Sequence, residues 1–499
     1  MPFLQLVLTS ILFAKCDGAR ILVGISSPFA ENQIVFQELW KGLLEKGHEL
    51  TLLTTHSMNN DSLTNLEEIL WHEPIEKNRV HQRLFAFTNY DYNLPLEIVD
   101  RELNYSKVKE LLHEDREFDL VITEYHVSVL YALAELYNCP LLLISNTDLS
   151  AYMYHNFGNP AHPAYNPDLT LPYKHPLNFM QRFISTSVLY GTKLFYNLVV
   201  SKKENALIRK HFGRNFSTVQ DLQERISAVL VNQNPILGHI RPLVPTIVPI
   251  GGALHIKPPQ PLPQTVESFI ESSPNGIIYV SLESISSKTL NIIQKSLEEV
   301  PYNSIMRYDG NLVSDTGKLL VDQWTPQQDI LRHRGVKLFI THGGAQSVEE
   351  AIYFKVPMLM LPTHSDQRAM AHCMLSKDVA LSLNHDAMKK KQFKSAILDL
   401  LENAKYRRKM KYLNELVHDQ PFTGLETAIW WADYVIRNKG ARHLKHNNTD
   451  IPWYQYLLLD IICFFLSIFL LMIFLIYLTI RIITYIVRWC CFKKKEKVQ

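Results

Sequence analysis

Short apolar runs of strand length alternate with amphipathic stretches in the first half of the chain. The runs predict strands at residues 21–25, 50–54, 118–124 and 140–145. Apolar side chains at helical spacing predict helices between these strands, at residues 34–44 and 127–137. Strand-helix-strand repeats build a parallel sheet with helices on both faces. The first half is therefore predicted to be an α/β domain.

The pattern loosens between residues 148 and 176, where prolines and tyrosines alternate, and a long loop is expected there. Residues 179–200 then form an apolar, aromatic-rich stretch that predicts one helix or a pair of helices. Three interpretations remain open for this stretch. It fits a buried core helix, the wall of a binding pocket, or a surface that rests on a membrane.

The second half repeats the alternation after a turn-rich break at residues 249–252, which a proline-rich connector soon follows. A helix is predicted from Ser347 onward. Strands are predicted at residues 276–284, 336–340 and 356–362. We therefore expect two doubly wound domains, at residues 19–248 and 249–440.

Composition and charge exclude several classes of protein. The chain has 499 residues, of which 47% are hydrophobic and 20% charged, and this is enough for two domains of ordinary composition. The net charge of +2 gives no sign of the clustered basic face that nucleic-acid binding requires. No CxxC, HExxH or GxxxxGK[ST] pattern occurs, so the sequence predicts no metal site and no ATP site.

Both ends of the chain carry apolar segments that point to a membrane. Residues 1–18 resemble a secretory signal peptide, and a buried first strand is the alternative. Residues 457–480 contain Asp460 as their only charge and are long enough to span a bilayer. Residues 481–499 form a basic tail, which the positive-inside rule places in the cytoplasm. We expect a single-pass type I protein with a luminal body.

Glycosylation sequons agree with this topology. All of them precede the predicted span, at Asn60, Asn104, Asn215 and Asn447. Lys495 and Lys497 stand near the end of the chain in a pattern like the dilysine retrieval signals of endoplasmic-reticulum residents. The expected location is therefore the endoplasmic reticulum membrane.

Candidate chemistry concentrates between residues 324 and 367. A helix that follows Gly343 and Gly344 would direct backbone N–H groups toward a pyrophosphate, and the glycines would let the backbone approach it closely. His342 and Ser347 add hydrogen-bond donors, and Glu350 could accept the hydroxyls of a ribose. Further contacts to such a ligand are expected from Trp324, Gln327, Asp366 and Gln367.

The order and spacing of these residues resemble the donor-binding signature of the UDP-glycosyltransferase superfamily, which includes the animal UDP-glucuronosyltransferases. The signature appears as Trp-x-Pro-Gln from Trp324, His-Gly-Gly-x-x-Ser-x-x-Glu from His342, and Asp-Gln at Asp366. The resemblance implies two facing doubly wound Rossmann-like α/β domains, the GT-B arrangement, plus one C-terminal transmembrane helix. It also implies that the first domain binds the acceptor and the second binds the UDP-sugar.

The resemblance implies a role for each residue of the signature. Trp324 would stack on uracil, Gln327 would lie beside the base and the ribose, and Glu350 would hold the ribose hydroxyls. The phosphates would meet His342, Gly343, Gly344 and Ser347. Asp366 and Gln367 would bind hydroxyls of the transferred sugar.

The chain departs from the family pattern at four positions near the donor site. Gln346 stands where Asn is usual, Lys355 where a glycine normally precedes Val-Pro, and Met370 where Asn commonly follows Asp-Gln. Glu283 replaces the glycine of a Ser-Leu-Gly-Ser turn that borders the phosphates in the family. The expected consequences concern the sugar contacts and the turn more than uracil binding.

A fifth departure concerns the catalytic base. Inverting glycosyl transfer needs a group that takes the proton of the attacking hydroxyl. The family supplies a histidine after the first strand, and that position holds Asn32, whose amide cannot accept a proton at physiological pH. The acidic partner of this histidine corresponds to Glu124. Glu31 and His126 are alternative bases.

The resemblance therefore predicts an inverting glycosyltransferase that moves a hexose or glucuronate from a UDP-sugar co-substrate to a small lipophilic acceptor, with no cofactor. The alternative is a catalytically impaired UDP-sugar-binding member that acts as a partner of active relatives. Expected partners are the UDP-sugar, the acceptor and the membrane, with no nucleic acid. A homo- or hetero-oligomer remains possible.

Overall fold

The structure is a computed structural model. It describes residues 18–26, 33–58, 60, 62–71, 93–168, 170–171, 173, 176–238, 240–282, 285–308, 317–363, 365–445 and 452–496, with the backbone alone at residues 365, 366, 453 and 490–496. The chain divides into two compact units, Met1–Lys445 and His446–Gln499. Residues 1–17 of the predicted signal peptide, Glu31, Asn32, Glu283 and Asn447 lie outside the described residues.

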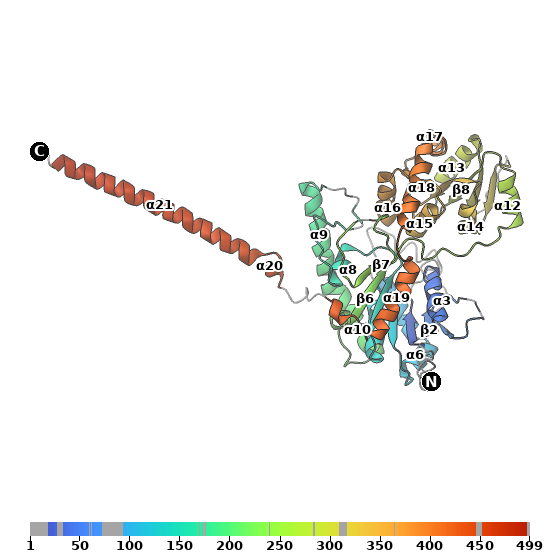
Figure 1. The fold of residues 1–499 in the computed structure, drawn as a ribbon, viewed down its shortest axis with the longest axis horizontal. Helices are drawn as coiled ribbons and strands as arrows, with labels where there is room; N and C mark the ends of the chain where they lie inside the picture. The colour runs from blue at the N-terminus through green and yellow to red at the C-terminus, as the bar shows by residue number, and fades with distance from the viewer. Residues whose placement is uncertain are drawn as a thin grey trace, which may run out of the picture. The chain divides into compact units, whose positions relative to one another are not determined.

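The first sheet of the large unit contains seven strands among the described residues, in the order β3-β2-β1-β4-β5-β6-β7 (Figure 1). All neighbouring strands pair in parallel. Their interiors are apolar because helices bury both faces of the sheet. The strands are β1 (Arg20–Gly24), β2 (Glu49–Thr54), β3 (Leu66–Leu70), β4 (Leu120–Glu124), β5 (Leu141–Ser145), β6 (Ile226–Val231) and β7 (Ile247–Pro249).

The helices between these strands follow the predicted alternation, with two corrections. The described helical segments are α3 (Gln37–Glu45), α5 (Asn93–Leu103), α6 (Ser106–His113), η1 (Ser128–Tyr131), α7 (Ala132–Leu136), α8 (Ala151–Asn156), α9 (Phe179–Phe195), η2 (Tyr196–Val200), α10 (Ser201–His211) and α11 (Val219–Gln223). The helix predicted at residues 127–137 is a 3₁₀ turn, η1, that continues into the short α7.

The second correction is α8, which lies inside the stretch expected to be a long loop. Ser150 caps this helix, because its side chain accepts a hydrogen bond from the backbone N–H of Met153. Tyr152 and Tyr154 are buried, so packing stabilises a segment whose prolines and tyrosines resemble a loop in sequence.

The second sheet contains six parallel strands among the described residues, in the order β10-β9-β8-β11-β12-β13. The strands are β8 (Ile277–Ser281), β9 (Asn303–Arg307), β10 (Leu319–Asp322), β11 (Val336–Thr341), β12 (Met358–Met360) and β13 (Ala380–Ser382). The helices are α12 (Gln264–Glu271), α13 (Ser287–Glu299), α14 (Gln327–Arg332), α15 (Ala345–Tyr353), α16 (Ser365–Ser376), α17 (Lys390–Glu402), α18 (Ala404–His418), α19 (Gly424–Arg437) and η3 (Arg442–Leu444). Both sheets therefore share the doubly wound strand order of a dinucleotide-binding fold.

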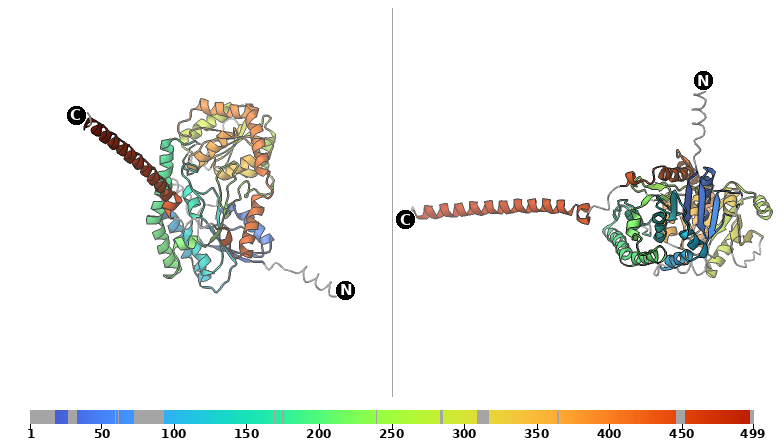
Figure 2. Two further views of the ribbon diagram at one scale, coloured as in Figure 1. Left: turned by 60° about the vertical axis from the view of Figure 1, so that its left-hand side comes forward. Right: turned by 90° about the horizontal axis from the view of Figure 1, so that it is seen from below.

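Helix α19 packs against the first sheet although it follows the second sheet in sequence (Figures 1 and 2). Ala428, Ala432 and Val435 join the apolar cluster that includes residues of α3 and β1. The side chain of Asp433 also lies 2.9 Å from Nε2 of His48. Helix α19, near the end of the large unit, therefore packs on the strand-helix-strand unit formed by β1, α3 and β2.

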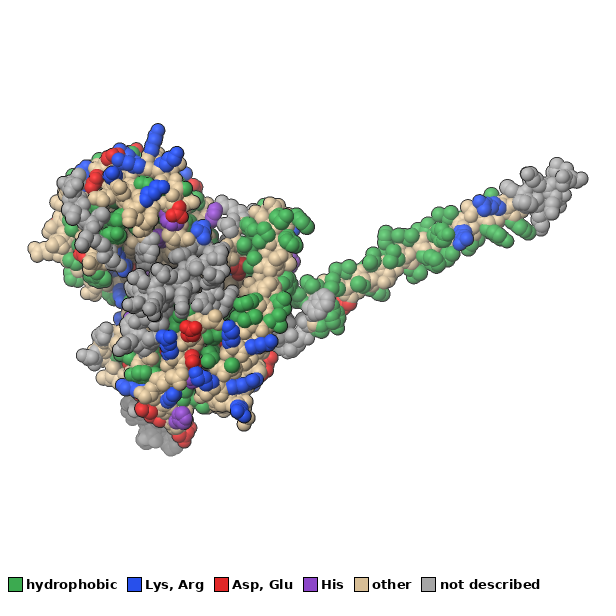
Figure 3. Space-filling view, turned by 180° about the vertical axis from the view of Figure 1, so that it is seen from behind, with side chains coloured by type: hydrophobic (Ala, Val, Ile, Leu, Met, Phe, Trp, Pro, Cys, Tyr) green, Lys and Arg blue, Asp and Glu red, His purple; other side chains and the backbone are tan. Residues whose placement is uncertain are grey.

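The helix α9 presents most of its apolar side chains to solvent. Phe179, Phe183 and Leu194 are 73%, 59% and 60% exposed, and Ser185 and Leu189 are the buried residues of α9. Figure 3 shows hydrophobic side chains gathered on one face of the body. The core-helix interpretation of residues 179–200 is therefore wrong, and the pocket-wall and membrane-surface interpretations remain.

The C-terminal unit is helical among its described residues. It consists of α20 (Trp453–Tyr456) and α21 (Leu459–Glu496). The most apolar 18-residue window of the span Leu459–Trp489 has a mean hydropathy of 3.1, and the helix is long and apolar enough to cross a membrane by length and composition. The helix continues past residue 480 into the predicted basic tail.

Candidate active site

The signature residues of the second half surround the point where the strand order of the second sheet reverses. This reversal lies between β8 and β11, and the carboxyl end of β11 leads directly into His342, Gly343 and Gly344. In doubly wound sheets, ligands bind outside the carboxyl ends of the strands at such a point. The fold therefore places the predicted phosphate-binding turn where a nucleotide is expected.

The turn itself requires one of its two glycines. Gly343 has a φ of +91°, and a Cβ atom there would lie 2.3 Å from Cε of Met360. Gly344 is the N-cap of α15, without a side-chain cap, and a Cβ atom there would meet nothing within 4 Å. The backbone at Gly344 therefore has open space on the side where a Cβ atom would stand, so a ligand can approach the start of α15 there.

Three signature residues come together beside this helix. Gln327, the first residue of α14, donates hydrogen bonds from Nε2 to Oγ of Ser347 at 3.1 Å and to Oε2 of Glu350 at 2.6 Å. Glu350 is buried on α15, one turn beyond Ser347. The residues predicted to meet the base, ribose and phosphates therefore form one connected cluster.

Two residues outside the signature hold the same carboxylate. Gln328 donates from Nε2 to Oε1 of Glu350 at 3.0 Å, and Nε2 of His255 lies 3.2 Å from that oxygen. His255 also faces the neighbouring carboxylate, since its Nδ1 lies 3.6 Å from Oε2 of Glu349. All three ionisable side chains are buried. The cluster thus contains one imidazole between two carboxylates.

The charges of the buried Glu349 and Glu350 favour the protonated form of His255. Burial lowers the pKa of His255, but the contact with Glu350 and the charges of both carboxylates outweigh it, so the net pKa is raised above the ordinary value. Burial raises the pKa of Glu349, and the charge of His255 opposes that change. His255 therefore supplies the positive charge that allows two adjacent carboxylates to be buried.

The sequence prediction did not include His255 or Gln328. His255 stands in the connector between the two sheets, far from the signature in sequence, and only its position after Gly251-Gly252 sets it apart. Gln328 directly follows the signature residue Gln327. Both glutamines reach Glu350 because this carboxylate faces the start of α14.

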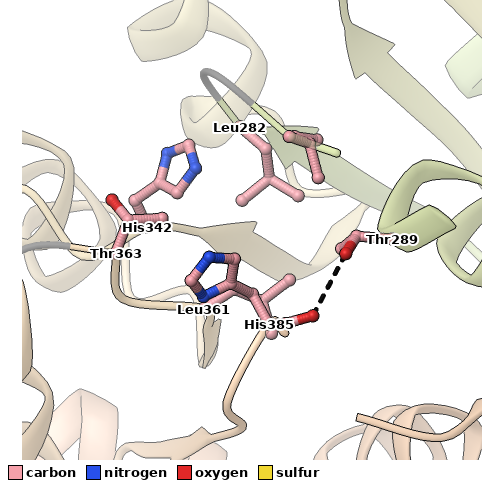
Figure 4. A pocket seen from close by; sticks show the side chains of 7 residues that line it. Leu282, Thr289, His342, Leu361, Thr363 and His385 are labelled. Carbon is pink, nitrogen blue, oxygen red and sulfur yellow. Dashed lines mark hydrogen bonds between the residues drawn. The ribbon is translucent and has the colours of Figure 1, made fainter. Parts of the chain in front are cut away.

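His342 faces a different part of the site. It lines a small pocket with Leu282, Leu361, Thr363 and His385, and Figure 4 shows the two imidazole rings on the walls of that pocket. Thr289 donates a hydrogen bond to the backbone carbonyl of His385 at 3.1 Å, which joins α13 to the segment after β13. The pocket thus borders the carboxyl ends of β8, β11 and β12.

The remaining signature residues lie at the edges of the site. Trp324 is 67% exposed, so its ring is accessible for stacking. Oε1 of Gln367 accepts hydrogen bonds from the backbone and the hydroxyl of Thr363, each at 2.9 Å. Asp366 lies in the first turn of α16, and its side chain is outside the described atoms. The sugar-binding roles of Asp366 and Gln367 stay predictions.

The departures from the family pattern have different structural outcomes. Lys355 follows α15 with a φ of +63°, the left-handed region that favours glycine. The turn nevertheless forms, with the N–H of Val356 donating to Ala351 O at 2.8 Å. Met370 packs against the apolar core of the second sheet, and Gln346 is half-buried in the first turn of α15.

The strand order of the first sheet reverses at a matching point, where β1 and β4 adjoin, and the predicted acceptor-side residue Glu124 lies there. Glu124 ends β4 and is buried, and its Oε2 lies 4.0 Å from Nε2 of His126. The His126 side chain is 35% exposed, and partial desolvation lowers its pKa below the ordinary value, so its imidazole is neutral at pH 7. A histidine and a carboxylate therefore stand together at the carboxyl end of β4.

A second buried carboxylate accompanies this pair. Glu102 accepts a hydrogen bond from Oγ of Ser26, two residues after β1. Burial raises the pKa of Glu102 to about 8, which the Ser26 hydrogen bond opposes and the charge of Glu124 reinforces. Glu102 is therefore largely protonated at pH 7. The sequence offered no signal for Glu102, which lies on α5.

The described sequon asparagines all lie on the surface. Asn60, Asn104 and Asn215 are exposed residues of the large unit. Their exposure is compatible with the predicted glycosylation.

The chain is similar to known proteins along most of its length. The family described as "UDP-glucoronosyl and UDP-glucosyl transferase" matches residues 33–498. The chain belongs to this family. Among its relatives, UDP-glucosyltransferase 2 of Dactylopius coccus is 31% identical over 482 residues, which cover 93% of each chain. UDP-glucuronosyltransferase 2B16 of Oryctolagus cuniculus is 32% identical over 388 residues, which cover 76% of this chain and 73% of the relative.

Solved structures agree with the fold of the family. A glycotransferase of kitacinnamycin superposes with a TM-score of 0.60 at 15% identity, covering 83% of this chain and 99% of that one. A UDP-glucosyltransferase from Polygonum tinctorium, solved in a complex with 3,4-dichloroaniline, superposes with a TM-score of 0.59 at 16% identity, covering 85% and 99%. The GT-B fold with two doubly wound sheets and one apolar C-terminal helix is thereby confirmed, as is membership of the UDP-glycosyltransferases.

Proposed function

We propose that this UDP-glycosyltransferase moves a hexosyl or glucuronosyl group from a UDP-sugar to a small lipophilic acceptor, with inversion at the anomeric carbon. The observation that carries the proposal is the hydrogen-bonded cluster of Gln327, Ser347 and Glu350 beside the open N-terminus of α15. The relatives include both glucosyl- and glucuronosyltransferases, so either sugar fits the family.

Each half of the site has a distinct role in this proposal. The turn from His342 to Gly344 and the N–H groups of α15 hold the pyrophosphate, which carries the negative charge of the leaving UDP. Glu350 accepts the ribose hydroxyls and Trp324 stacks on uracil. On the acceptor side, His126 takes the proton as the acceptor oxygen attacks, and Glu124 stabilises the imidazolium that results.

A location follows from the ends of the chain. The apolar α21 anchors the protein in the endoplasmic reticulum membrane, with the large unit in the lumen and the basic residues after the span in the cytoplasm. The exposed sequon asparagines of the large unit support this orientation.

Titration with UDP tests the donor site. We expect Glu350→Gln to weaken UDP binding by about 1.5–3 kcal/mol, because the ribose loses a hydrogen bond to a charged acceptor. Calorimetry measures the affinity, and Glu415→Gln on the exposed face of α18 is the matched control. Equal UDP affinity of the native chain and Glu350→Gln would remove Glu350 from the site.

One specific observation favours a second function. Asn32 stands at the position where the family usually has the catalytic histidine. In this second function the chain binds a UDP-sugar, does not transfer the sugar, and acts as a partner of active relatives. Incubating the purified chain with UDP-glucose and UDP-glucuronate and a panel of phenols, amines and acids separates the two functions. UDP release that depends on an acceptor supports the enzyme, and UDP binding without release supports the partner.

A further inference from the structure

We infer that His255 is a positioning residue for the donor site: held between Glu349 and Glu350, it fixes the carboxylate that receives the ribose and links this carboxylate to the connector between the two sheets. The inference rests on the proposed donor site. The inference adds His255, a residue outside the signature, to the donor site. It also predicts that protonation of His255 controls recognition of the ribose.

The geometry around Glu350 supports a fixed orientation. Its Oε1 accepts a hydrogen bond from Gln328 at 3.0 Å and lies at ion-pair distance, 3.2 Å, from Nε2 of His255, whereas Oε2 receives the hydrogen bond of Gln327 at 2.6 Å. A carboxylate can accept about four hydrogen bonds, two at each oxygen. Oε1 is therefore occupied on the side of the connector, and Oε2 retains capacity for a ribose hydroxyl.

The connector is itself fastened to the donor-site helices. The backbone carbonyl of His255 accepts a hydrogen bond from Gln328 Nε2 at 3.1 Å, and the N–H of Lys257 donates to Gln328 Oε1 at 2.9 Å. On the other side of His255, the N–H of Gly252 lies 3.4 Å from Oε1 of Glu349. Contacts on both sides therefore determine where the imidazole lies.

The charge of His255 gives this arrangement a dependence on pH. The groups that face the imidazole are the carboxylates of Glu349 and Glu350 and the backbone of Gln346, all from α15. Because the pKa of His255 is raised, the imidazolium persists below that value and is lost as pH rises through it. Deprotonation leaves two adjacent buried carboxylates without a counter-charge, so Glu350 is less well placed for the ribose.

The experiment compares UDP with 2′,3′-dideoxy-UDP, which lacks the ribose hydroxyls. For His255→Gln we expect UDP affinity to fall about 10- to 100-fold, a loss of the size seen when a residue that orients a metal ligand is removed. The affinity for dideoxy-UDP should stay unchanged, because this ligand makes no contact through Glu350. His113→Gln, on the exposed face of α6, is the matched control.

A second measurement uses the native chain alone and does not depend on the folding of a variant. The ratio of UDP to dideoxy-UDP affinity, followed from about pH 6 to about pH 9, should fall as His255 deprotonates. The two ligands share the diphosphate, so its ionisation cancels in the ratio. His255→Gln should show a ratio independent of pH.

The outcomes separate this inference from the proposed function. The role of His255 would be overturned if His255→Gln lost the same factor of affinity for UDP and for dideoxy-UDP. It would also be overturned if the ratio of the two affinities in the native chain did not change with pH. Either result would leave the donor site in place. A native chain that binds neither ligand would overturn the proposed donor site and the inference with it.

Discussion

The proton of the acceptor hydroxyl is the main chemical question at the scale of single residues. Asn32 cannot take it, whereas His126 is neutral at pH 7 and lies 4.0 Å from the buried Glu124. The carboxylate stabilises the imidazolium once it forms, as in other histidine-carboxylate pairs. We therefore expect His126 to serve acceptors that must lose a proton.

Replacing His126 by glutamine should slow transfer to a neutral alcohol about 10²- to 10⁴-fold, the usual contribution of a general base. Transfer to a matched amine should change little, because the amine brings its own nucleophilic lone pair. Steady-state rates on the two acceptors check this. Asn32→His is the companion variant, and it should raise the rate on the alcohol if Glu124 can orient the new imidazole.

Two results would contradict this assignment. If His126→Gln slows the amine as much as the alcohol, the residue supports the structure or acceptor binding and is not the base. If the alcohol rate is unchanged, another base is present, and Glu31 becomes the next position to replace.

Single residues also mark the limit of sequence prediction. The spacing of Gln327, Ser347 and Glu350 predicted a cluster that the structure shows as direct hydrogen bonds. His255 could not be predicted, because its contact with Glu350 depends on the path of the connector along α14 and α15. Local spacing carries information about one strand-turn-helix unit but not about how a distant connector crosses it.

The same limit appears among the helices and strands. β11, the glycine turn and α15 were predicted from apolar periodicity and turn residues, since both signals are local. Helix α8 was missed because its stability comes from the burial of Tyr152 and Tyr154 against the rest of the domain. The surrounding prolines favour a loop, whereas Ser150 is a suitable helix N-cap, so the local signals in this stretch conflict.

The end of α15 allows a quantitative prediction. Lys355 has a φ of +63° and follows the C-cap, and its N–H donates to Ile352 O while that of Val356 donates to Ala351 O. These bonds form a Schellman motif, in which glycine is the preferred residue at the left-handed position. A non-glycine residue in that region costs about 1–2 kcal/mol.

Lys355→Gly should therefore raise the free energy of unfolding by about 0.5–1 kcal/mol, after the greater entropy of glycine in the unfolded chain is subtracted. Denaturant unfolding of the large unit measures the change. Lys411→Gly, in the exposed interior of α18, is the matched control and should lower stability by about 1 kcal/mol. A destabilised Lys355→Gly would show that the lysine side chain contributes more than the backbone strain costs.

At the scale of the whole molecule, two sheets of the same strand order are joined by the connector that carries His255, and α19 returns to the first sheet. The donor signature lies on the second sheet, and the candidate base follows β4 of the first. In the proposed reaction, both sheets contribute to transfer. The contact of Asp433 with His48 holds α19 against the first sheet and so fixes the end of the large unit.

The orientation of the whole chain in the membrane gives the last prediction. All sequons precede the apolar α21, and Asn104 and Asn215 are exposed on the large unit. If that unit is luminal, these asparagines meet the glycosylation machinery, and glycosidase treatment should increase the gel mobility of the protein. Asn104→Gln and Asn215→Gln should each remove one step of that change. An unchanged mobility, together with protease digestion of the large unit in intact microsomes, would place the body in the cytoplasm, where UDP-sugars would reach it without crossing the membrane.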